Sequence, residues 1–240
     1  MNRITEKEAV DALQHGDVLA LGRAADAIRR ERYGDTATFL IDRNINYTNV
    51  CQNECRFCAF YCKQDDPRAY LLSTDEILAK CRETAEAGGT QVMIQGGLYP
   101  GLGLDYYLDM LRAIKAEFPQ LVIHSFTATE IQHFAKEAGL SIRETLLRLQ
   151  DAGLASLPGG GAEILDDAVR SRVSPKKIST QDYLDVMRTA HSIGMESTAT
   201  MVIGLGETME QRIASMARVR DLQDETGGFR AFIMWTFQPG

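Results

Sequence analysis

The sequence lacks any long apolar run and any excess of basic residues, and each absence excludes a class of protein. Its 240 residues carry 26 lysines and arginines against 33 aspartates and glutamates, a formal net charge of −7. A global basic field that would attract nucleic acid is therefore absent. No stretch approaches the roughly 18 apolar residues of a membrane-spanning helix. The start, MNRITEKEAV, lacks the apolar core of a secretory signal. We expect a cytoplasmic protein with neither a nucleic-acid nor a membrane partner.

Internal repeats, low-complexity tracts and linkers are also missing, and short β-rich runs alternate with amphipathic helices instead. The apolar fraction of 45% is enough for a large core. The β-rich runs recur about every thirty to forty residues, the length of a βα unit. We expect strands at 36–40 continuing towards Tyr47, and at 91–94, 121–125, 155–157, 198–203 and 229–235.

The clearest helix signals lie between these strands. Ser73 and Glu76 form the pattern of a capping box, and Gly88 stops the helix that follows. Three further helices are expected over 104–114, from Thr180 onward, and from Glu207 to near Gly227. Regular βα alternation predicts an α/β fold with parallel strands and right-handed crossovers. Six units fit a (β/α)6 partial TIM barrel over 36–240, after a helical segment over 1–35.

Glycine-rich turns follow several of the predicted strands, at Gly96–Gly97, Gly159–Gly161 and Gly204 with Gly206. Ligands of parallel α/β folds bind beyond the C-terminal ends of the strands, so we expect the binding site there. The sequence stops at Gly240, directly after the last predicted strand. A parallel strand without its covering helix exposes apolar surface. We therefore expect a C-terminal segment to be missing.

Four of the five cysteines fall within twelve residues, at Cys51, Cys55, Cys58 and Cys62. An odd number of cysteines in a cytosolic chain favours metal or redox chemistry over disulfides. Thiolates favour iron–sulfur clusters, zinc or copper(I). A structural zinc takes four ligands, with Cys62 as the candidate fourth, whereas three ligands on a cubane cluster leave one iron open. Cys81 lies on the apolar face of a predicted helix and is expected in the core.

The spacing Cys51-x3-Cys55-x2-Cys58, with Phe57 before the third cysteine, resembles the signature of the radical S-adenosylmethionine superfamily. This resemblance implies a 4Fe–4S cluster on the three cysteines and S-adenosylmethionine on its open iron. One-electron reduction then yields methionine and a 5′-deoxyadenosyl radical, with the cofactor carrying the hard chemistry. The rival interpretation is a non-catalytic barrel with a structural metal.

The resemblance extends along the chain, through the segments 43–50, 95–98, 158–164, 222–228 and 235–239. Together they look like the radical enzymes of the futalosine route to menaquinone. The resemblance implies a cyclase that closes dehypoxanthine futalosine: a ribose hydrogen is abstracted, the carbon radical adds to the benzoate ring, and an electron and a proton leave. Aminofutalosine synthase, which joins the adenosyl group to a benzoate vinyl ether, is the alternative. Deazaflavin precursor synthases share the entry motif but usually lack the triple glycine, which counts against them.

The same resemblance implies a reducing partner, such as flavodoxin or ferredoxin, and roles for single residues. Gln95, Gly96 and Gly97 correspond to the site of the methionine amino group, although an ordinary turn would also explain the glycines. Phe57 and Gly204 would approach the adenosine, or Phe57 merely packs.

Catalytic or polar-contact roles are expected for Glu163, towards ribose hydroxyls, and for His124. The alternatives are a helix-start glutamate and a structural histidine. Trp235 and Gln238 are expected near the substrate, and His191 in the core. One departure stands out: Leu205 occupies a position where the futalosine enzymes usually carry histidine.

Overall fold

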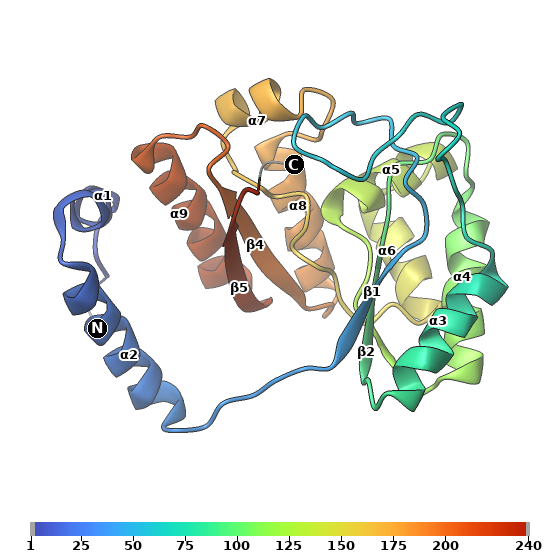
Figure 1. Ribbon diagram of the computed structural model, residues 1–240, viewed down its shortest axis with the longest axis horizontal. Coiled ribbons are helices and arrows are strands. Elements are labelled where there is room, and N and C mark those ends of the chain that lie inside the picture. Colours follow the sequence, from blue (N-terminus) through green and yellow to red (C-terminus); the bar gives the residue numbers. More distant parts are fainter. Residues whose placement is uncertain (1–2, 239–240) are drawn as a thin grey trace.

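The computed structural model describes residues 3–238. Its strands pair in parallel and are β1 (Asp42–Asn46), β2 (Gln91–Gln95), β3 (Val122–Ile123), β4 (Ser197–Ile203) and β5 (Phe229–Thr236). Its helices are α1 (Glu6–His15), α2 (Val18–Tyr33), α3 (Thr74–Glu86), α4 (Leu104–Glu117), α5 (Ala128–Ala138), α6 (Ile142–Asp151), α7 (Asp167–Val173), α8 (Thr180–Ser192) and α9 (Met209–Thr226). Helices α3 to α9 lie outside a curved row of strands (Figure 1).

The strands follow one another around the barrel in chain order. One sheet is β1-β2-β3 and the other is β4-β5. The segment 155–157 joins them, because Ser156 forms a parallel bridge with His124 and Leu157 forms one with Ser197. Two backbone hydrogen bonds lie on each side of this segment, at 2.9–3.2 Å. Six parallel segments in sequence order confirm the predicted (β/α)6 partial barrel.

Two of the predicted strands differ from the structure. The run 36–40 is not a strand: it is exposed, Phe39 is 88% accessible, and pairing begins only at Asp42, which lies opposite Gln91. A β-rich run without a neighbouring strand has no partner for its backbone groups, so composition alone was misleading. The segment 155–157 pairs as expected but makes only single bridges.

The helix predictions are correct in place, with small shifts at the ends. Ser73 caps α3 in a full capping box with Glu76. The caps of α8 and α9 are Ser179 and Thr208, one residue from the expected starts. Helices α5, α6 and α7 were not among the predicted ones.

Apolar side chains from the helices and the outer faces of the strands form the main core. Four aromatic rings lie at its centre, and Tyr47, Tyr107, Phe126 and Phe134 contact one another at centroid separations of 3.8–6.3 Å. All four are at most 1% exposed. Burial of such a ring stabilises a fold by about 1.5–3 kcal/mol. This cluster anchors the end of β1, directly before the cysteine loop.

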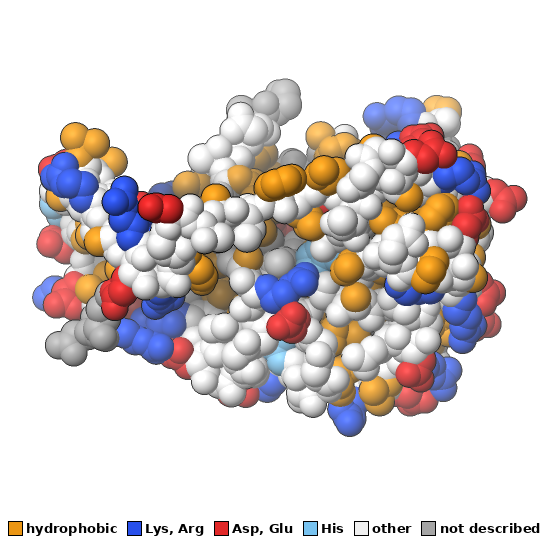
Figure 2. Space-filling view, turned by 90° about the horizontal axis from the view of Figure 1, so that it is seen from below, with side chains coloured by type: hydrophobic (Ala, Val, Ile, Leu, Met, Phe, Trp, Pro, Cys, Tyr) orange, Lys and Arg blue, Asp and Glu red, His pale blue; other side chains and the backbone are white. Residues whose placement is uncertain are grey.

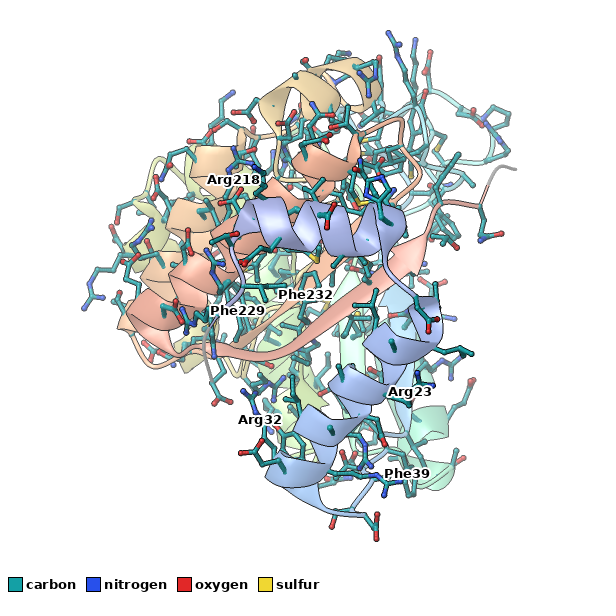
Figure 3. All side chains as sticks on the ribbon, turned by 90° about the vertical axis from the view of Figure 1, so that its left-hand side faces the viewer. Arg23, Arg32, Phe39, Arg218, Phe229 and Phe232 are labelled. Atoms are coloured by element: carbon teal, nitrogen blue, oxygen red, sulfur yellow. The ribbon has the colours of Figure 1, made fainter. Side chains whose placement is uncertain are left out.

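The first 35 residues contain the helical pair α1 and α2. Helix α1 packs against α9, and Arg3 pairs with Asp224. Helix α2 buries no residue and stands apart from the barrel (Figure 1). The face seen from below is hollowed between this pair and the barrel (Figure 2). Phe232, on the outer side of β5, is visible between α1 and β5 in Figure 3 and is 43% exposed. Among residues 3–238, no helix is both long and apolar enough to cross a membrane.

Candidate active site inside the barrel

One large cavity fills the inside of the barrel. Its volume is about 1030 Å³. Ligand pockets typically measure roughly 300–1,000 Å³, so this one has room for more than a single small ligand. Its wall includes most of the predicted site residues, namely Cys51, Cys55, Phe57, Cys58, Gln95, Gly96, Gly97, His124, Glu163 and Trp235. Residues far apart in sequence therefore meet in one space, as expected for strand ends of a parallel barrel.

The three cysteines lie on the long loop between β1 and α3. Cys55 is buried, Cys51 and Cys58 are partly exposed, and all three thiols are free. Cys62 fixes the loop through its backbone, because its carbonyl accepts from Cys51 N–H at 3.1 Å and its own N–H donates to Asn49 at 2.9 Å. Cys62 is itself buried and is not part of the cavity wall. The structure thus separates three cavity cysteines from a fourth that supports the loop.

Gly96 and Gly97 hold the cysteine loop close to the end of β2. A Cβ on Gly97 would lie 2.1 Å from the Val50 carbonyl oxygen and 2.8 Å from Cys51 Cβ, and a Cβ on Gly96 would lie 2.8 Å from the Tyr47 ring. Any larger side chain at either position would displace one of these groups. The two glycines are therefore required for packing, and they also line the cavity.

Gln95 lies at the end of β2, and its side chain borders the cavity. No hydrogen bond joins its amide group to another of residues 3–238. A polar side chain on the cavity wall near the cysteines, with its donors and acceptor unused by the protein, is available to a ligand.

Glu130, which was not predicted from the sequence, supports the turn at Gly96 and Gly97 through hydrogen bonds. Its carboxylate accepts from Gly96 N–H at 3.0 Å, from the Tyr47 hydroxyl at 3.0 Å, and from Thr127 N–H and hydroxyl at 2.8 Å each. Burial raises the pKa of Glu130 to about 7, although these hydrogen bonds act against the shift. Its signal in the sequence is the capping box of Thr127 and Glu130 that begins α5.

Glu163 and Lys177 form a shielded ion pair beside the cysteines. Lys177 Nζ lies 2.7 Å from Glu163 Oε1, with the side chains 9% and 13% exposed. The same ammonium lies 5.4 Å from the centre of the Phe57 ring, in cation–π range. Burial lowers the pKa of Lys177, but Glu163 and Cys55 outweigh it, so the pKa is raised and the lysine stays charged. Glu163 has φ of 50°, a strained value for a side chain of its kind.

The donor set fits a cubane cluster better than a single metal ion. Within residues 3–238, no three His, Cys, Asp or Glu side chains gather around one point. A tetrahedral zinc site requires such a gathering, whereas a cubane takes its thiolates at separate corners. Burial raises the pKa of Cys55 to about 11, and Lys177 lowers it in part. The positive charges of bound iron and of the Lys177 ammonium would both favour the thiolate form of Cys55. Cys51, Cys55 and Cys58 would therefore hold the cluster.

His124 is 3% exposed and borders the cavity level with the start of β2, because its backbone N–H donates to the Val92 carbonyl at 3.0 Å. Its Nδ1 lies 2.7 Å from Ser156 Oγ, and Arg230 Nη2 lies 3.0 Å from the same hydroxyl. Burial, and then the charge of Arg230, lower the pKa of His124 to about 4. The histidine is therefore neutral near pH 7 and does not supply a proton as an imidazolium. Ser156 and Arg230 were not predicted.

The turn at Gly204 and Leu205 does not border the cavity. The Glu207 carboxylate accepts from both N–H groups, at 2.9 Å and 2.8 Å, and Leu205 packs with Ile164, Val169 and Met201 in a small apolar cluster. Leu205, at the position where the futalosine enzymes usually carry histidine, therefore packs into the protein between two glycines of positive φ and does not border the cavity. Contact of Gly204 with a cofactor stays a prediction.

Four remaining residues are placed as follows. Trp235 borders the cavity, whereas Gln238 is outside its wall and donates to Thr236 at 2.9 Å. His191 is a structural histidine, since its two nitrogens contact Thr226 and Ser197 at 2.7 Å and 2.8 Å. Cys81 is in the main core, as predicted.

Fold and site together define a class: a parallel barrel with three loop cysteines at the cofactor end of an internal cavity. Comparison with known proteins gives the family. The profile of the Radical SAM superfamily matches residues 45–219, and the chain belongs to that superfamily. A 4Fe–4S cluster and S-adenosylmethionine, expected from the sequence, are the cofactors of these proteins.

Individual relatives point to two reactions. The chain is 49% identical over 241 residues to the cyclic dehypoxanthine futalosine synthase of Streptomyces coelicolor, covering 99% of this chain and 60% of the relative. It is 41% identical over 235 residues to the 5-amino-6-(D-ribitylamino)uracil–L-tyrosine 4-hydroxyphenyl transferase of Methanococcoides burtonii, covering 98% of this chain and 65% of the relative. The chain thus spans under two thirds of their length.

The fold also matches a solved structure. The crystal structure of methylornithine synthase superposes with a TM-score of 0.76 at 19% identity, covering 99% of this chain and 66% of that chain. At this identity the likeness concerns the fold alone, and it agrees with the partial barrel.

Proposed function

We propose that this chain is the radical-forming part of a cyclase that converts dehypoxanthine futalosine into its cyclic product. The observation that carries the proposal is the single cavity, with Cys51, Cys55 and Cys58 at one end and polar groups along its length. The 49% identity to a cyclic dehypoxanthine futalosine synthase supports the choice of reaction. A cavity of this size suits a nucleoside substrate together with a nucleoside cofactor.

When bound, the cluster and S-adenosylmethionine supply the 5′-deoxyadenosyl radical. The residues of the chain orient and enclose the reactants. Gln95 offers an unused amide near the cysteines, and Glu163 offers a carboxylate already held by Lys177. The strained backbone at Glu163 fixes that carboxylate at the wall, so it can accept from hydroxyl groups of a ribose.

A transferase is the second candidate, because the chain is also 41% identical to a ribitylaminouracil–tyrosine hydroxyphenyl transferase. Aminofutalosine synthase is the third candidate, from the sequence alone. A small reductant such as flavodoxin or ferredoxin is part of the proposal in each case.

The decisive experiment is anaerobic turnover of the cluster-loaded chain with S-adenosylmethionine and dithionite. One arm contains dehypoxanthine futalosine and the other contains 5-amino-6-(D-ribitylamino)uracil with L-tyrosine. We expect 5′-deoxyadenosine and a product two hydrogens lighter than the substrate in the first arm only. A new product in the second arm, or none in the first from a fully loaded sample, would overturn the cyclase proposal. Cys58→Ala serves as the inactive control, matched by Cys62→Ala.

A further inference from the structure

The cavity runs the full length of the strands, and its end opposite the cysteines is also built from polar side chains. The cysteines and Gln95 lie at the C-terminal ends, whereas Asp42, Gln91 and Arg230 lie where β1, β2 and β5 begin. From Arg230 to Trp235 the strand rises about 3.3 Å per residue, so the two ends are about 17 Å apart. A substrate that extends along the cavity from the cofactor beside the cysteines would reach this second end.

Arg230 faces the cavity because of a β-bulge. Ser197 pairs with Phe229, and the next residue, Thr198, pairs with Ala231, so Arg230 is the extra residue. Both Arg230 and Ala231 border the cavity, followed in alternation by Ile233 and Trp235. A β-bulge changes the direction of one side chain and locally disrupts the backbone hydrogen bonds between the two strands. Here the side chain that it turns inward is a guanidinium.

Within residues 3–238, the guanidinium of Arg230 forms only a long ion pair with a carboxylate. Its closest acidic neighbour in the described part of the chain is Glu196, 3.9 Å from Nε, beyond hydrogen-bond range. Asp42, the other carboxylate at this end, already accepts from Gln91 at 2.9 Å. Within residues 3–238, the positive charge of Arg230 is therefore balanced only by this long ion pair, and no carboxylate lies within hydrogen-bond range of it.

His124, a neighbour of Arg230 that also borders the cavity, adds one more donor. Arginine can only donate, so Ser156 Oγ accepts from Arg230 and gives its single proton to His124 Nδ1. The imidazole is then neutral and carries its proton on Nε2, an assignment made from this network. Within residues 3–238, no group accepts from His124 Nε2. A guanidinium fork and a neutral imidazole N–H together suit one planar anion.

We propose that Arg230, with His124 and Ser156, forms a carboxylate-binding site that anchors the substrate at the end of the cavity opposite the cluster. This inference rests on the proposed function in taking the carboxylate to be that of the benzoate ring. A carboxylate held there would place the remainder of the substrate along the cavity, between Arg230 and the cofactor. The site would also accept other aromatic or amino-acid carboxylates, and it would reject their amides.

The test compares acid and amide ligands on the complete chain. Binding of dehypoxanthine futalosine, its carboxamide, and benzoate is measured by calorimetry on wild type and Arg230→Gln. Because Arg230 is 38% exposed, solvent weakens its charge-assisted hydrogen bond, and we expect an effect at the lower end of the range for such bonds, about tenfold in affinity. We expect wild type to favour the acid over the amide by about tenfold, and Arg230→Gln to bind both alike.

Two variants serve as controls. Arg143→Gln removes an exposed arginine of α6 without a hydrogen bond in the structure and should leave the acid–amide ratio unchanged. Glu196→Gln removes the distant carboxylate and should leave the ratio equal or raise it. Equal loss of acid and amide binding in Arg230→Gln, or no preference in wild type, would overturn the inference. If benzoate binds in an Arg230-dependent manner but dehypoxanthine futalosine does not bind, the carboxylate site stands and the proposed cyclase fails.

Discussion

Replacing Gly97 by alanine tests whether the end of β2 positions the cysteine loop. The added Cβ would lie 2.1 Å from the Val50 carbonyl oxygen. In real proteins a Cβ is essentially never found within 3.0 Å of a non-bonded heavy atom. The loop must therefore move by about 1 Å, and Cys51, whose Cβ is 2.8 Å from the new atom, moves with it. Overpacking of this kind typically costs about 1–3 kcal/mol.

The effect on cofactor loading should exceed the effect on stability. A metal-binding constellation tolerates errors of only about 0.5 Å, so a 1 Å shift of one ligand should reduce iron loading by more than half. We expect a lower iron and sulfide content per chain and weaker thiolate–iron absorbance after anaerobic reconstitution. The Tm should fall by roughly 2–12 °C, because a cost of about 1 kcal/mol lowers it by about 2–4 °C in a chain of this size.

Gly103→Ala is the matched control, because Gly103 has nothing within 4 Å of its added Cβ and a φ of −68°. It should load iron as the wild type does and lose little stability. If Gly97→Ala reconstitutes fully with an unchanged spectrum and Tm, the loop does not depend on this contact, and the account of the two glycines is wrong.

Three other predictions concern the cysteines and two buried groups. Cys58→Ala should abolish cluster loading while Cys62→Ala retains it, as measured by iron content; equal loss in both would make Cys62 a ligand. The pKa of His124 is lowered to about 4, against about 6.5 when unfolded, so the unfolded chain binds more protons between these values and stability rises with pH across them. In urea unfolding at pH 4.5 and 7.5, His124→Gln should remove up to about 3 kcal/mol of that rise, and an unchanged slope would refute the burial argument. Glu130→Gln places an amide NH2 against the donors of Thr127 and should cost about 1–3 kcal/mol of unfolding free energy, whereas an unaltered value would show that the carboxylate is not needed.

Local signals in the sequence were sufficient for α3, α4, α8 and α9 and for most of the strand order, but not for α5, α6 and α7. The capping box at Ser73 and Glu76 depends only on neighbours three residues apart, and it is formed as expected. The strand expected at 36–40 failed because β-pairing depends on a partner from elsewhere in the chain. Asp42 finds Gln91 opposite, whereas Phe39 has no strand beside it.

The candidate site could be predicted where it follows from position at a strand end, as for Cys51 and Gln95. It could not be predicted where contacts between distant parts of the chain determine which side chains face the cavity. Lys177 follows α7 with no motif of its own and becomes part of the site by pairing with Glu163. Arg230 faces inward only because of a bulge, which no periodicity in the sequence reveals. Leu205 shows the converse, since it follows the end of β4 and yet packs into the protein instead of bordering the cavity.

The short segment 155–157 has a mechanical consequence. Within residues 3–238, it carries the strand pairing between the sheet that holds the cysteine loop and the sheet that holds Arg230, through two backbone hydrogen bonds on each side. Such a joint resists relative motion of the two sheets less than the seven-residue pairing of β4 with β5 does. A ligand touching both Gln95 and Arg230 would span this joint from within, so its binding would stiffen the barrel as well as fill it.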